Sequence, residues 1–104
     1  MDQPKLTFTY GFDENDEFET QQRGYCDHVV VDLPTRLQYR VIFYEPVRLA
    51  QSLETLQESG KVCLGEPGLI VVPTVTLHYM QEAVNQLYKE GYFEHLAPLK
   101  QKVE

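Results

Sequence analysis

Hydrophobic and polar positions alternate with period two in the first part of the chain. This alternation predicts a strand at about 5–12, in which the apolar positions are Leu6, Phe8, Tyr10 and Phe12. Segments 25–33 and 37–45 alternate in the same way and contain many β-branched and aromatic residues, which strands favour. We therefore expect three strands within the first 45 residues.

The second and third of these strands are expected to form a hairpin around Pro34-Thr35-Arg36. A three-residue turn aligns the apolar positions of both strands, whereas a slip of one residue would move every side chain to the opposite face. The expected cross-strand pairs on the apolar face are Leu33/Leu37, Val31/Tyr39, Val29/Val41 and Asp27/Phe43. The expected pairs on the other, mixed face are Asp32/Gln38, Val30/Arg40, His28/Ile42 and Cys26/Tyr44.

Helical spacing dominates the second half of the chain. Pro46 suits a first helical position, Leu49, Leu53 and Leu56 follow at helical intervals, and Ser59-Gly60 provides an end signal. A second helix is expected at about 76–90, with Thr76 as its N-cap. Between the helices, 61–64 could form an edge strand, and the unbroken apolar run 69–72 predicts a strand covered on both faces.

The resulting order is β-β-β-α-(β)-β-α, which predicts an α+β fold. We expect a two-layer sandwich in a single domain, 1–104, with a mixed sheet of four to five strands and two helices on one face. The link from 37–45 to 69–72 has crossover length, so these two strands should be parallel. The mixed sheet face could be a dimer or partner surface, or the N-terminal segment could cover it. The tail, 92–104, would be packed or partly mobile.

The charge is unevenly distributed along the chain. The net charge is −7, and residues 1–33 contain eight of the sixteen acids against two bases, Lys5 and Arg23. We interpret 13–24 as an acidic loop, in which Asp13, Glu14, Asp16 and Glu17 are candidate binding residues. Such a surface repels phosphate backbones, so no nucleic-acid partner is expected. It would suit a basic protein partner, or it could simply keep the protein soluble.

Several classes of function lack the sequence features that they need. No apolar run approaches the ~20 residues of a membrane span, and no export signal is present, so we expect a cytoplasmic protein with no membrane partner. Two cysteines are too few for a disulfide framework. There is no CxxC or HExxH motif, and no calcium-loop or phosphate-loop pattern, so we expect no metal and no cofactor.

Cys26-Asp27-His28 is the strongest candidate for catalysis, since a nucleophilic thiol needs a base. In a regular strand, however, the Cα atoms of Cys26 and His28 would be about 6.5 Å apart, beyond direct hydrogen-bond reach. Asp27 would point to the opposite face. We therefore interpret Cys26 as a small packed hydrophobe. Arg40, on the mixed face, is expected to pair with Asp32, with anion binding as the alternative.

These observations favour a non-enzymatic protein-interaction or regulatory module. It could be a homodimer, or an inhibitor or immunity-type protein for a basic toxin. The alternative is a small enzyme or ligand-binding domain with a pocket near the 25–45 hairpin, using Tyr10, Cys26, His28, Arg40 and Tyr44. The binding candidates are thus the four acids of 13–24 together with Cys26, His28, Arg40 and Tyr44.

Overall fold

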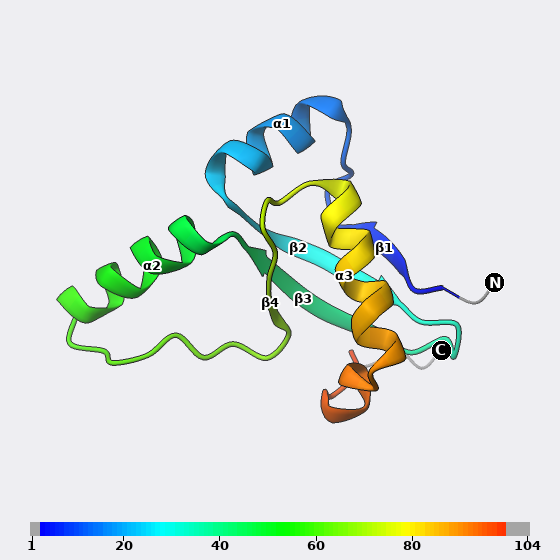
Figure 1. Ribbon diagram of the computed structural model, residues 1–104. Helices are drawn as coiled ribbons and strands as arrows, with labels where there is room; N and C mark the ends of the chain where they lie inside the picture. Colours follow the sequence, from blue (N-terminus) through cyan, green and yellow to red (C-terminus); the bar gives the residue numbers. More distant parts are fainter. Residues whose placement is uncertain (1–2, 100–104) are drawn as a thin grey trace.

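The computed structural model describes residues 3–99 and has four strands in one mixed sheet (Figure 1). The sheet order is β1-β2-β3-β4, with antiparallel β1–β2 and β2–β3 pairs and a parallel β3–β4 pair. The strands are β1 (Lys5–Phe8), β2 (Tyr25–Asp32), β3 (Gln38–Tyr44) and β4 (Leu69–Val71). The other elements are α1 (Glu14–Arg23), α2 (Pro46–Glu58), α3 (Leu77–Lys89) and the 3₁₀ turn η1 (Tyr92–His95). The predicted α+β architecture is confirmed.

The hairpin register is confirmed near its turn and wrong at its open end. Val29 pairs with Val41 and Val31 with Tyr39, as expected. A bulge between Cys26 and Val29 then shifts the pairing. As a result, Phe43 lies opposite Cys26 instead of Asp27, and Tyr44 lies opposite Tyr25 instead of Cys26. The bulge places Cys26 in the core, because an extra residue on one strand reverses the face of those beyond it.

The first strand is shorter than expected, since β1 ends at Phe8. Gly11 has φ +79°, and Phe12 stacks on Phe8 with ring centroids 4.3 Å apart. A left-handed backbone is readily accessible to glycine, so the chain turns here while both rings stay against the core.

The prediction of an acidic loop at 13–24 is wrong, because most of this segment is the helix α1. Asp13 and Asp16 form a capping box: the Asp16 N–H donates to Asp13 Oδ1 at 2.9 Å, and the Asp13 N–H donates to Asp16 Oδ2 at 3.0 Å. Carboxylates in a first turn are favoured by the helix dipole. Gly24, at φ +79°, ends the helix. The acids that suggested a loop therefore stabilise the start of a helix.

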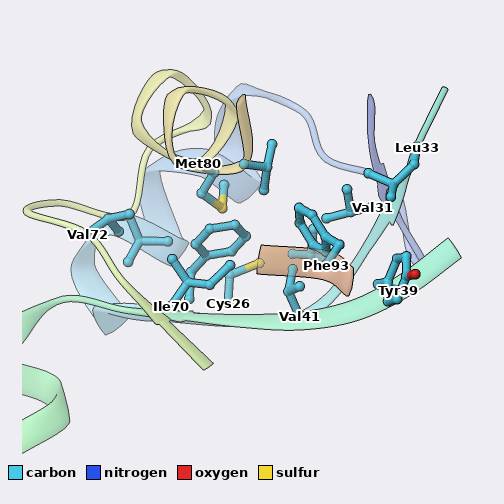
Figure 2. Packing of buried hydrophobic residues seen from close by; sticks show 13 residues of the cluster. Cys26, Val31, Leu33, Tyr39, Val41, Ile70, Val72, Met80 and Phe93 are labelled. Atoms are coloured by element: carbon cyan, nitrogen blue, oxygen red, sulfur yellow. The ribbon is translucent and has the colours of Figure 1, made fainter. Parts of the chain in front are cut away.

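One sheet face carries the hydrophobic core, as Figure 2 shows. Strands β2 and β3 contribute six buried side chains, namely Cys26, Val29, Val31, Tyr39, Val41 and Phe43. Met80 and Val84 come from α3, and Phe93 comes from η1. Each of these is at most 4% exposed. The predicted helix 76–90 thus packs on the face that the apolar alternation marks.

The helix predicted to begin at Pro46 is present as α2, but it extends away from the sheet (Figure 1). It contains no buried residue, whereas α3 crosses the sheet and contributes Met80 and Val84 to the core. The parallel crossover between β3 and β4 is confirmed. The optional edge strand at 61–64 is not formed, because these residues have no regular secondary structure.

As far as it is described, from residue 3 onward, the N-terminal segment does not cover the mixed face, since β1 pairs with β2 in the plane of the sheet. The tail is packed as far as it is described: the Leu99 N–H donates to the Gln38 carbonyl at 2.7 Å, on an edge of β3. The rest of the predicted tail, 100–104, lies outside the described residues.

Candidate functional site

The acidic candidates lie on or beside α1, and three of the four have partners within the fold. Asp13 and Asp16 cap the helix, and Glu17 accepts a hydrogen bond from the Leu77 N–H at the start of α3. Glu14 is exposed in the first turn. Three of the four acids thus have a structural role within the fold.

Cys26, His28 and Asp27 come closer together than a regular strand allows. Cys26 Sγ lies 4.0 Å from His28 Nε2, and His28 Nδ1 lies 3.6 Å from Asp27 Oδ1. The expectations that the thiol is out of reach and that Asp27 points away are therefore wrong. The bulge between Cys26 and Val29 changes the side-chain directions on which they relied.

This cluster nevertheless lacks the properties of a reactive thiol. Cys26 is 0% exposed, and burial is the main cause that raises the pKa of its thiol above the usual range. Asp27 acts in the same direction, whereas a hydrogen bond with the backbone of His28 and the charge of Arg23 lower the pKa. A thiol that is protonated and closed to solvent is a poor nucleophile, so the geometry supports a packing role.

The remaining candidates, Tyr10, Arg40 and Tyr44, lie in different parts of the molecule. Tyr10 lies beside His28, with ring centroids 5.7 Å apart, and Tyr44 stacks on Tyr25 at 5.9 Å. Arg40 pairs across the sheet with Val30 and lines a hollow with Leu96 and other residues of the tail. In the part of the chain that the structure describes, Asp32 makes no ion pair with Arg40 and instead accepts hydrogen bonds from Thr7 and Gln38. The five candidates of the ligand-binding hypothesis thus do not share one described hollow.

Two arginines that the sequence analysis did not select converge on Tyr25. The guanidinium carbon of Arg48 lies 4.9 Å from the centroid of the Tyr25 ring, and that of Arg23 lies 5.4 Å from it. Gly24 permits this approach, because a Cβ atom there would lie 2.8 Å from the Cβ of Arg48 and 2.7 Å from a carboxylate oxygen of Glu45. The only hint in the sequence is that Arg23 and Tyr25 are two residues apart.

The α2 helix has an apolar stripe that no other element of the described chain buries. Leu49, Leu53 and Leu56 lie on one side of the helix, and Leu53 is 36% exposed. Val62, shortly after the helix, is 88% exposed. A helix with such a stripe ordinarily packs it against something.

The described residues contain neither a metal-binding cluster nor a membrane-spanning helix. Within residues 3–99, no three His, Cys, Asp or Glu side chains are grouped so as to hold a metal ion. None of the helices there has both the length and the apolar character needed to cross a bilayer.

Comparison with known proteins gives no assignment: the chain matches no protein-family model, no curated protein and no solved structure. Any function must therefore be inferred from the residues of this chain alone.

Proposed function

We propose that this protein is a non-enzymatic interaction module that forms a homodimer through α2. The observation that carries the proposal is the contrast within α2 between an apolar stripe and the lack of any buried residue. The start of α2 is well specified, because Pro46 occupies the first turn and the Glu45 side chain accepts hydrogen bonds from the N–H groups of Val47 and Arg48.

An unpacked helix of this length needs a partner. Isolated helices shorter than about 12–15 residues are marginal in water, and most helical stability in proteins comes from packing of an apolar face. α2 has 13 residues, so it is roughly 20 Å long. Pairing two copies of the stripe would bury Leu49, Leu53 and Leu56 without changing the rest of the fold.

Charge favours a second copy as the occupant of this surface. Segment 46–64 has two bases, Arg48 and Lys61, and two acids, Glu54 and Glu58, so it is neutral overall. The excess acid of the chain is concentrated in residues 1–33, much of it on α1. Two copies could therefore meet through α2 with little repulsion, in an isologous contact in which the same patch serves both chains. The two free cysteines are compatible with the reducing cytoplasm that we propose as its compartment.

Light scattering coupled to size-exclusion chromatography at several protein concentrations tests this proposal. We expect a dimer for the wild type and a monomer for Leu53→Glu, because a buried carboxylate without a partner is costly. Gln51→Glu is the matched control: it adds the same charge on the opposite side of α2 and should remain dimeric. A wild type that stays monomeric at about 0.5 mM, or two variants that behave alike, would contradict self-association through α2.

A further inference from the structure

The pair of arginines over Tyr25 has unsatisfied hydrogen-bonding capacity. Arg48 Nε is buried and has no hydrogen-bond partner, and Arg23 donates to Thr20 Oγ1 at 3.3 Å. Among residues 3–99, neither guanidinium has a carboxylate oxygen within 4.0 Å. A buried donor without an acceptor lowers the stability of the folded state, so the presence of one here calls for an explanation.

The lack of a carboxylate partner is unexpected in a chain with sixteen acids and nine lysines and arginines. The nearest candidate, Glu45, uses its carboxylate to cap α2 through Val47 and Arg48 N–H groups. Two cations therefore approach one aromatic ring without a counter-charge from the described part of the chain. Stacking on an aromatic ring can orient a guanidinium group while its terminal N–H groups stay available for other partners.

A hollow of polar side chains begins at the same arginine. It has a volume of about 330 Å³ and is lined by Arg48, Gln51, Ser52 and Thr55 of α2. These three neighbours offer hydroxyl and amide groups, which donate and accept hydrogen bonds without adding charge. The surface therefore combines a cationic end with a neutral polar extension.

We propose that Arg23 and Arg48 form a binding site for the phosphate of a small, hydroxyl-rich phosphomonoester. Two guanidinium groups supply more N–H donors than a single carboxylate readily uses, and a phosphate has three terminal oxygens that pair bidentately with arginine. The hollow along α2 would receive the hydroxyl groups. A polyanion such as nucleic acid is disfavoured, because a net charge of −7 repels an extended phosphate backbone but not one local phosphate. This site does not depend on dimerisation, since all of its residues belong to one chain.

Titration with inorganic phosphate, followed through the arginine Nε–H signals in ¹H–¹⁵N NMR spectra, tests the site directly. We expect saturable shifts of the Arg48 and Arg23 signals, and at least about tenfold weaker binding for Arg23→Gln and for Arg48→Lys. Arg48→Lys keeps the charge but not the fork of donors, and Arg23 is exposed, so both variants should keep the fold. Arg40→Gln is the control, because it removes the same charge from β3, at a position paired with Val30 and not with Tyr25.

Two results would overturn the phosphate site, and a third would overturn the hydroxyl-rich ligand. The first is no saturable shift at tens of millimolar phosphate, and the second is an Arg40→Gln variant that weakens binding as much as Arg23→Gln. Glucose 6-phosphate, with glucose and sulfate as comparisons, tests the polar extension. We expect glucose 6-phosphate to bind more tightly than inorganic phosphate and sulfate, and glucose alone not to bind; equal affinity for all three anions would overturn the hydroxyl-rich ligand.

Discussion

The body of this protein and its α2 arm contrast sharply in how their apolar residues are used. The body, meaning the sheet with α1, α3 and η1, buries Phe43, Met80 and Phe93 almost completely. The α2 arm, meaning residues 46–67, contains an amphipathic helix in which no residue is buried. Both regions have clear local signals for their secondary structure. The difference shows that clear local signals can specify a helix even where the described chain does not bury its apolar side.

The largest expected effect is a loss of stability from truncation of the core, compared with the same kind of change in the arm. Phe43→Ala should lower the free energy of unfolding by about 3–5 kcal/mol, because it removes a fully buried ring and leaves a cavity. Leu53→Ala should change it by about 0.5 kcal/mol or less, since this side chain is 36% exposed and alanine favours helices. Urea denaturation at low micromolar concentration measures both. Equal losses would mean that the arm packs within its own chain.

A second pair of substitutions compares two glycines in left-handed backbone. Gly60, just after α2, has φ +86° and no atom within 4 Å of a Cβ placed on it. Gly68, just before β4, has φ +81°, and its Cβ would lie 2.5 Å from the Arg40 carbonyl oxygen. Gly60→Ala should lower the free energy of unfolding by about 1 kcal/mol, from backbone strain alone. Gly68→Ala should lower it by about 3 kcal/mol, because a clash with the backbone is added to the strain. Similar thermal unfolding midpoints for the two variants would contradict this close approach.

The smallest expected effect concerns reactivity, and it separates the two cysteines. Cys63, in the arm, is exposed and should react with iodoacetamide at once near pH 7.5. Cys26, in the body, should remain unlabelled in the folded protein, because burial blocks access and raises the pKa of its thiol above the usual range. Since the folded thiol has the higher pKa, its contribution to stability is fully present below the ordinary pKa of a cysteine thiol and decreases as the pH rises above it. Mass spectrometry of the alkylated peptides distinguishes the two sites, and rapid labelling of Cys26 before unfolding would refute its assignment to the core.

Periodicity along the chain predicted most of the body correctly. The alternation around Val29, Val31 and Val41 predicted the hairpin, its turn and its buried face, because β-strand side chains alternate strictly. Proline, threonine and glycine signals predicted the starts or ends of α2 and α3. These features depend on neighbours in the sequence, so the sequence alone contains them.

The errors arose where a local pattern had two physical interpretations. Asp13 and Asp16 indicated a solvated loop by their charge, but three-residue spacing also allows them to cap a helix reciprocally. The bulge after Cys26 could not be predicted from alternation, because the same residues also fit a regular strand. It was the bulge that placed Cys26 in the core and brought its sulfur within 4.0 Å of His28.

The sequence by itself determined the strands, the two longer helices, the hairpin turn and the concentration of acid in residues 1–33. Only the tertiary structure decided which helix packs on the sheet. It also decided that Arg23 and Arg48 meet at Tyr25. The physical reason is sequence separation. Helix and strand propensities arise from a few adjacent residues, whereas Arg48 is 23 residues from Tyr25 and reaches it only because Gly24 lets the base of α2 approach β2.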